Sequence, residues 1–210
     1  SMGACLITGL INWGRVRTYQ HKWRLSYPHM TWRQGFQHMR QQKENYQDSL
    51  MLLCAGGYSG ISAETLHLTP QQWLDISYKI RLEHECTHYF TKRVFGAMRQ
   101  HLHDELLADY AGIVAGIGRF RADWFYHFIG LENYPEYRMG ARLQNYISTE
   151  LLTSPHFDQL KTTLYQAAQT LEQFDQQIAC HHRGLQGKGM VLSTIAASSL
   201  SQLAAPNAYA

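Results

Sequence analysis

The strongest constraint on the fold is a run of 25 residues without Pro or Gly, which lies between Pro70 and Gly96. Thr69 and Gln72 have the spacing of a capping box around a Pro at the first helical position, and Gly96 is a typical residue to end a helix. We therefore expect a helix roughly 38 Å long. One side of it carries residues at helical spacing that are expected to point inward: Trp73, Ile76, Ile80, His84, His88 and Phe95.

This helix contains an H-E-x-x-H pattern, as His84-Glu85-Cys86-Thr87-His88. Two histidines four residues apart lie one above the other on a helix, so both imidazoles can bind one Zn²⁺ ion. Glu85 projects about 100° around the helix, from where a carboxylate can act as general base toward a water in an open metal position. Cys86 occupies a variable position of the pattern and is expected to pack beside the ligands. Because the chain has 12 His, the pattern needs support from its context.

That context is a pair of carboxylates further along the chain, Glu105 and Asp109, which are also four residues apart. Zinc held by two histidines needs a third protein ligand, for which a carboxylate is suitable, and a further carboxylate commonly accepts the free N–H of a ligating imidazole. Gly112 and Gly116 continue the same face, where small residues let two helices approach closely. The alternative reading, a solvated helix face, does not account for these glycines.

On these residues the chain resembles the gluzincin group of zincin metallopeptidases, in which a second helix carries a Glu and, one turn later, an Asp. Residues 82–113 also resemble small uncharacterised bacterial proteins with a zincin-like core.

The resemblance implies a zinc-dependent hydrolase, a metallopeptidase that cleaves a peptide or protein substrate. It implies Zn²⁺ bound by His84, His88 and Glu105, with Glu85 as general base and Asp109 supporting a ligand histidine. The first rival is a non-catalytic zinc-binding or interaction protein on a zincin scaffold. A fourth protein ligand in place of an open metal position would favour that rival.

The expected fold is α+β and mostly helical, with a zincin-like core of a small sheet, the H-E-x-x-H helix and the helix of Glu105. The length favours one domain, over residues 1–192, with a mobile Ala/Ser-rich tail at residues 193–210. Residues 49–55 indicate a buried strand, a possible edge for an extended peptide by analogy with zincins, and residues 119–130 a core helix. A further amphipathic helix is indicated by Leu160, Leu164, Ala168, Leu171, Phe174 and Ile178.

Two histidines compete with Glu105 as third ligand, namely His101 and His103. Their spacing after His88 does not match the compact three-histidine arrangement. We therefore expect them to be surface or supporting residues.

A zinc hydrolase also needs a hydrogen-bond donor for the oxyanion of the reaction, and Arg142 or Tyr146 could supply it. Together with Arg138 these residues recur every four positions, so they are expected to share one helix face. The alternative that the sequence favours is a surface stripe of arginines with a packed tyrosine.

Residues 1–43 contain seven Lys or Arg and no acidic residue, with aromatic residues between them. These aromatic residues are Trp13, Tyr19, Trp23, Tyr27 and Trp32. Such a composition can bind single-stranded nucleic acid, which is the second rival function. No recognised nucleic-acid motif is present, so we expect the aromatic residues to pack on the core while the cationic groups reach water.

Composition adds a few limits. A net charge of +3 does not by itself indicate a polyanionic partner. The four cysteines, at positions 5, 54, 86 and 180, form no C-x-x-C pair, which favours a reducing, cytoplasmic setting. Cys180-His181-His182 is a weak second metal candidate, since histidines suit a helix end anyway. No apolar run reaches the roughly 18 residues of a membrane span.

Overall fold

The structure is a computed structural model that describes residues 4–96, 101–178 and 184–205. It is mostly helical, with a small antiparallel sheet of two strands, in agreement with the fold class expected from the sequence. The strands are β1 (Ala4–Ile11) and β2 (Gln47–Leu53), and the helices are α1 (Trp13–Ser26), α2 (Trp32–Arg40), α3 (Pro70–Phe95), α4 (His101–Ile117), α5 (Ala122–Ile129), α6 (Thr149–Leu152), α7 (His156–Ile178), α8 (Leu185–Ala197) and α9 (Leu200–Leu203). Where one domain was expected, the chain forms two compact units, Ser1–Cys54 and Ala55–Ala210.

The first unit contains the sheet, in which β1 pairs with β2 from Ala4 opposite Leu53 to Ile11 opposite Gln47. The strand expected at residues 49–55 is therefore present, but the prediction that it is buried is wrong. Its Leu50 and Leu52 side chains are 46% and 50% exposed, because the sheet has only two strands and leaves much of its surface uncovered.

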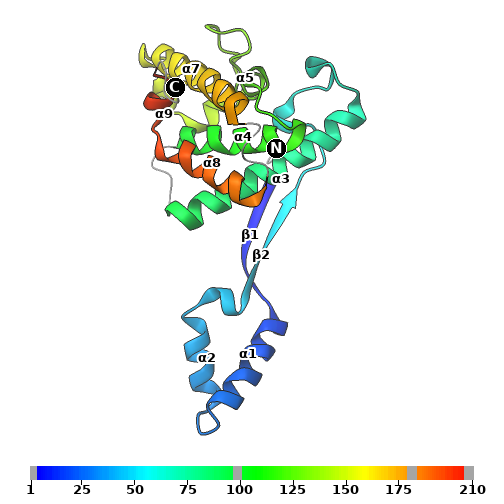
Figure 1. Cartoon of the computed structure of the whole chain (residues 1–210), viewed down its shortest axis with the longest axis vertical. Coiled ribbons are helices and arrows are strands. Elements are labelled where there is room, and N and C mark those ends of the chain that lie inside the picture. The colour runs from blue at the N-terminus through cyan, green and yellow to red at the C-terminus, as the bar shows by residue number, and fades with distance from the viewer. Residues whose placement is uncertain (1–3, 97–100, 179–183, 206–210) are drawn as a thin grey trace. The chain divides into compact units, whose positions relative to one another are not determined.

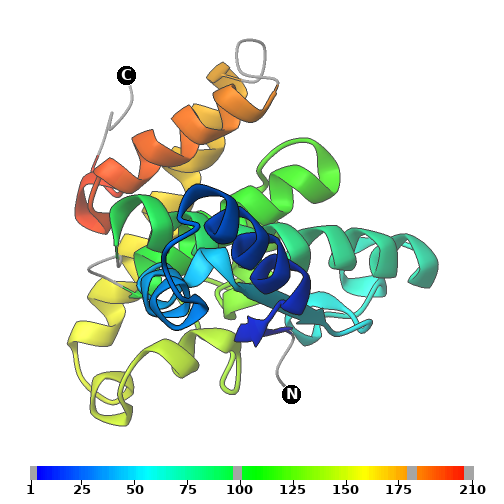
Figure 2. The ribbon, with the colours of Figure 1, turned by 90° about the horizontal axis from the view of Figure 1, so that it is seen from below.

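Helices α1 and α2 form a hairpin between these strands and lie side by side (Figures 1 and 2). Val16, Trp23, Gly35 and Met39 are buried in it. A Cβ atom at Gly35 would lie 2.8 Å from the Trp23 indole, so the glycine allows the close contact. The expectation that the amino-terminal aromatic residues pack inward holds for Trp23 but is wrong for Trp13 and Tyr27, which are 64% and 47% exposed.

In the second unit, α3 begins and ends as the sequence predicts. Thr69 accepts a hydrogen bond from the backbone of Gln72 in a capping box, and Gly96, with a φ of 85°, ends the helix. Most of the predicted stripe faces the core, with Ile80 fully buried. Phe95 departs from the prediction, because at 41% exposure the last residue of the helix lies beyond the packed region.

Helix α4 packs against α3 through glycines (Figure 1). A Cβ at Gly112 would lie 2.8 Å from the Ile80 carbonyl oxygen, and one at Gly116 would lie 3.0 Å from Ile80 Cγ1 and 3.1 Å from Ile76 Cγ2. The close approach predicted from these glycines is confirmed. It brings the face of α4 that carries Glu105 and Asp109 against α3.

The remaining helices complete the core of the second unit. Helices α5 and α7 bury the predicted aromatic and amphipathic segments, including Phe125, Phe128 and Leu164. The structure differs from the expected mobile tail at residues 193–203, which lie in α8, α9 and the turn that joins them, with Ile195 and Leu203 fully buried. In the described ranges, no helix combines the length and apolar character that a membrane span requires.

Candidate metal centre

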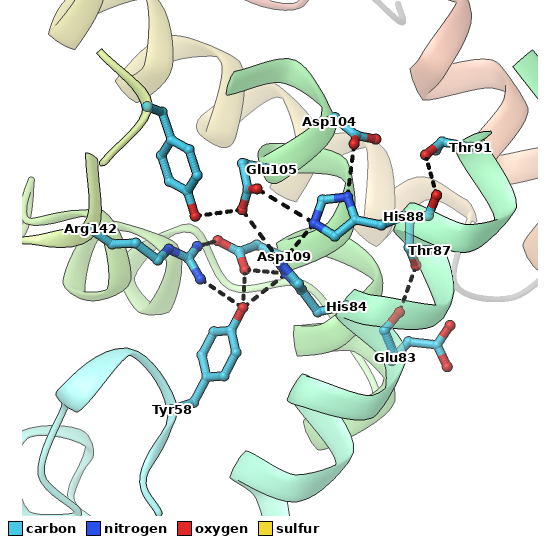
Figure 3. Close-up of polar contacts among 11 residues, drawn as sticks. Tyr58, Glu83, His84, Thr87, His88, Thr91, Asp104, Glu105, Asp109 and Arg142 are labelled. Atoms are coloured by element: carbon cyan, nitrogen blue, oxygen red, sulfur yellow. Dashed lines mark hydrogen bonds and ion pairs between the residues drawn. The ribbon is translucent and has the colours of Figure 1, made fainter. Parts of the chain in front are cut away.

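Three potential metal ligands converge between α3 and α4 (Figure 3). The Nε2 atoms of His84 and His88 are 3.0 Å apart. Glu105 Oε2 lies 3.4 Å from His84 Nε2, and Glu105 Oε1 lies 3.5 Å from His88 Nε2. The His84 side chain is 8% exposed, whereas those of Glu105 and His88 are 17% and 26% exposed, so these two are the more accessible of the three.

The outer nitrogen of each imidazole is held by a carboxylate. His84 Nδ1 lies 3.0 Å from Asp109 Oδ1, and His88 Nδ1 lies 2.8 Å from Asp104 Oδ2. A carboxylate accepts a hydrogen bond, so each Nδ1 carries the proton and each Nε2 presents a lone pair toward the other. Two such lone pairs 3.0 Å apart require a cation or a shared proton between them.

This arrangement fits a tetrahedral zinc ion. Zn–N and Zn–O bonds of about 2.0–2.1 Å place neighbouring ligand atoms about 3.3 Å apart. The three separations among His84, His88 and Glu105 range from 3.0 to 3.5 Å. The donor set, two imidazoles and one carboxylate, is also one that zinc prefers.

Tyr58 and Arg142 surround the carboxylate of Asp109, which is completely buried (Figure 3). The Tyr58 hydroxyl donates to Asp109 Oδ1 at 2.7 Å, and its oxygen accepts from Arg142 Nη1 at 2.7 Å. Arg142 Nη2 also donates to Asp109 Oδ2. Since Tyr58 gives its only proton to Asp109, its oxygen accepts from His84 Nδ1, at 2.9 Å. Burial raises the pKa of Tyr58 to about 12, partly opposed by Arg142, so the hydroxyl remains protonated.

Local contacts fix Tyr58 in place, although it lies in a turn rather than in a long helix. Its backbone N–H donates to Ser77 Oγ at 3.0 Å. In the same segment, Trp73 Nε1 donates to the Ile61 carbonyl at 2.7 Å. These two bonds attach the segment of Tyr58 to the part of α3 that precedes His84 and His88.

Tyr146 contacts the opposite side of the group. Its hydroxyl donates to Glu105 Oε2 at 2.8 Å. Burial, together with the charges of Glu105 and Glu85, raises the pKa of Tyr146, whereas Arg142 lowers it. Burial also acts to raise the pKa of Glu105, but the interaction with His84 and the charges of Arg142 and His88 outweigh it and lower that pKa to about 2. Glu105 is therefore ionised at neutral pH, as a metal ligand must be.

Glu85, the expected general base, is half-buried on α3. Its negative charge is a small contribution to the raised pKa of Tyr146. Cys86 differs from the prediction, because it is exposed and does not pack beside the ligands.

The predicted helical stripe of Arg138, Arg142 and Tyr146 is wrong. Gly140, with a φ of 83°, separates Arg138 from a 3-10 turn over Arg142–Tyr146. This break separates Arg138 from the other two side chains, which turn toward α4.

His103 is not in the metal group. It is buried, and its Nε2 lies 3.2 Å from the Ile195 carbonyl. Among the residues that the structure describes, the side chains close enough together to share a metal ion are those of His84, His88 and Glu105, without His101 or His103. Cys180-His181-His182 lies outside the described residues.

Sequence reasoning missed two residues of the site, Tyr58 and Asp104. Asp104 directly precedes Glu105, so the need of the second histidine for a carboxylate partner could have pointed to it. Tyr58 has no such signal, because it lies 26 residues before His84 in an irregular segment.

Fold and site together define a mostly helical protein with a candidate metal centre of two histidines and a carboxylate. The chain belongs to a family of unknown function, DUF7005, whose model matches residues 1–207. No curated protein and no solved structure matches the chain. Its function must therefore be inferred from the geometry of the site.

Proposed function

We propose that the protein is a zinc-dependent hydrolase with a zincin-like core that cleaves peptide bonds. The observation that carries the proposal is the convergence of His84 Nε2, His88 Nε2 and Glu105 within 3.0–3.5 Å of one another, with each Nδ1 held by a carboxylate. This arrangement leaves two nitrogen lone pairs and one carboxylate directed at a common point.

The charges around this point also favour a divalent cation. Arg142 neutralises much of the charge of Asp109, with which it forms an ion pair. The carboxylates of Glu105 and Asp104 then remain as negative charges beside the two imidazoles. A dication in a half-buried site is stabilised by such a balance.

Bound zinc would supply Lewis-acid chemistry, polarising a substrate carbonyl and lowering the pKa of a water. The chain's own residues supply the remaining parts of peptide hydrolysis. Glu85, one position after the first ligand, accepts the proton of the attacking water and returns it to the leaving amine. Tyr146 stays protonated and is the better candidate donor for the oxyanion, because the guanidinium of Arg142 is bound to Asp109 and Tyr58.

The non-catalytic alternative requires a different set of ligands. A purely structural zinc site is usually closed by four protein ligands. In the described part of the chain only three candidate ligands come together. The remaining buried histidine of α4, His103, is directed at a backbone carbonyl of α8.

Metal analysis of the purified protein tests the ligand set. The wild type should contain about one zinc per chain, and Glu105→Ala and His88→Ala should lose it. A wild type that binds no zinc, when purified without chelator and then supplied with the ion, would overturn the proposal.

Turnover is tested with Glu85→Gln on a mixture of unlabelled peptides, with new termini detected by mass spectrometry. This variant should keep its zinc and lose cleavage by about 100-fold or more, as expected for loss of a general base. Glu83→Gln is the matched control, because Glu83 lies on the same helix and pairs with Lys188 rather than with the metal group. Equal activity of Glu85→Gln and wild type would refute the assigned base.

A further inference from the structure

The helical hairpin of the first unit, residues 12–43, has a charge distribution unlike the rest of the chain. It contains seven Lys or Arg and no Asp or Glu, which gives a net charge of +7. Since the whole chain has a net charge of +3, the other residues together carry −4. The small net charge of the whole chain is therefore the sum of a strongly basic segment and a net acidic remainder.

Most of these cationic groups are available to a partner. Arg15 is the exception, because it forms an ion pair with Asp48 at 3.2 Å and donates to the Glu44 carbonyl. The others are exposed, and within the described residues none of them takes part in an ion pair: Arg17, Lys22, Arg24, Arg33, Arg40 and Lys43.

Exposed aromatic rings lie among these cations on both helices. On α1, Trp13 is 64% exposed and precedes Arg17 and Arg24 by four and eleven residues, which places the three within about 40° of one another around the helix. On α2, Phe36 is 41% exposed and lies three residues after Arg33 and four before Arg40, again on one side.

We infer that this hairpin binds single-stranded nucleic acid. Phosphates would contact the exposed arginines and lysines, while unpaired bases stack on Trp13 and Phe36. Aromatic rings with guanidinium groups about one to three helical turns away provide both contacts along one strand. The hairpin belongs to the first unit and the candidate metal centre to the second, and the inference does not depend on the proposed hydrolase activity.

Other partners fit the hairpin less well. A membrane-surface helix needs a continuous apolar face opposite its cations. Val16, Trp23 and Met39 are buried within the hairpin, and the exposed Leu25, Tyr27 and Met30 lie at its tip, where α1 ends and the turn to α2 follows, rather than along one helix face. A second copy would bring two +7 surfaces together and be repelled. Duplex nucleic acid offers phosphates but keeps its base faces stacked and inaccessible to exposed rings.

The test uses the full chain and fluorescence anisotropy with a labelled single-stranded oligodeoxythymidylate of about 20 nucleotides, which exceeds the site size of small binding modules. With about four to six phosphate contacts, log K should fall against log salt with a slope of about −3 to −4. Affinity should then drop about 50- to 300-fold between about 50 and 200 mM salt.

Charge-reversal variants locate the binding surface. The triple change Arg17→Glu, Arg24→Glu and Arg33→Glu should weaken binding at least about 30-fold and reduce the salt slope by about two. The matched control reverses three exposed cations of α3 and changes the net charge by the same amount: Lys79→Glu, Lys92→Glu and Arg93→Glu. It should bind almost as wild type, and an equal loss in both variants would overturn the assignment to the hairpin.

The stacking contacts are tested by Trp13→Ala, which should weaken binding about 5- to 150-fold. Tyr78→Ala is the control, because Tyr78 is similarly exposed, at 52%, but lies on α3. Unchanged binding by Trp13→Ala, equal affinity for a duplex of the same length, or binding to phosphatidylserine vesicles without binding to the oligonucleotide would each refute the inference. Absence of oligonucleotide binding at low salt would refute it as well.

Discussion

Replacement of Gly112 by Ala tests whether the contact between α3 and α4 positions the candidate metal centre. The added Cβ would lie 2.8 Å from the backbone oxygen of Ile80 and 3.0 Å from its Cγ2. The backbone of a helix cannot rotate away as a side chain can, so α4 must shift. Overpacking of this kind typically costs about 1–3 kcal/mol, while Ala in place of a helical Gly contributes about 1 kcal/mol of helix propensity. The expected net effect is a loss of up to about 2 kcal/mol of unfolding free energy.

Glycines elsewhere in the second unit supply matched controls for this substitution. Gly189 lies in α8, and no other group lies within 4 Å of the position that a Cβ would take there, so Gly189→Ala should stabilise the protein by up to about 1 kcal/mol. At Gly116 the nearest atoms belong to side chains of α3, at 3.0 and 3.1 Å. These side chains can adjust, and Gly116→Ala should have an intermediate effect.

Urea denaturation measures the three variants, and zinc titration accompanies it. Gly112→Ala should also bind zinc more weakly, because Glu105 lies on the same face of α4 and moves with it. If Gly112→Ala were as stable as Gly189→Ala and bound zinc like the wild type, the close helix contact would not be what positions the third ligand.

Three further predictions follow from single contacts. Asp104→Asn should lower zinc affinity about 10- to 100-fold, because it weakens the hydrogen bond that orients the His88 imidazole. Competition with a chelator measures the affinity, and an unchanged value would contradict that role. Tyr58→Phe should reduce stability by about 1–3 kcal/mol, because it removes the buried hydrogen bonds that the Tyr58 hydroxyl makes with Asp109 and Arg142. Thermal unfolding checks this, and an unchanged Tm contradicts it. Burial lowers the pKa of His103 below its usual 6.5. The neutral His103 side chain therefore stabilises the fold above pH 6.5, and this stabilisation is lost as the pH falls below 6.5. His103→Gln should therefore lose less stability than wild type between about pH 7 and pH 5, and equal losses would contradict the assignment.

The short-range parts of the site were predictable because they follow from helix geometry. The capping box before α3 and Gly96 after it depend only on residues within one turn. The four-residue spacing of His84 and His88 places both rings on one side, and the same holds for Glu105 and Asp109. The glycines of α4 indicated a close helix contact before the partner helix was known.

The errors arose where packing of distant segments decides the outcome. The strand near Leu50 has an apolar sequence, but its burial depends on how many strands join it, and within the described residues it pairs with β1 alone. Residues 193–205 look like a tail by composition, yet Ile195 and Leu203 become buried once α4 and α7 offer a surface. The arginine stripe failed because Gly140 interrupts the helix that its spacing requires.

The sequence by itself determined the long helix α3, the pairing of His84 and His88 on one side of it and the carboxylate face of α4, since each depends on contacts within one or two helical turns. Only the tertiary structure decided that Tyr58 and Arg142, 84 residues apart, meet at Asp109. It also decided which aromatic residues of the amino-terminal hairpin are exposed. Burial and long-range hydrogen bonds depend on the whole arrangement of helices, which no local pattern specifies.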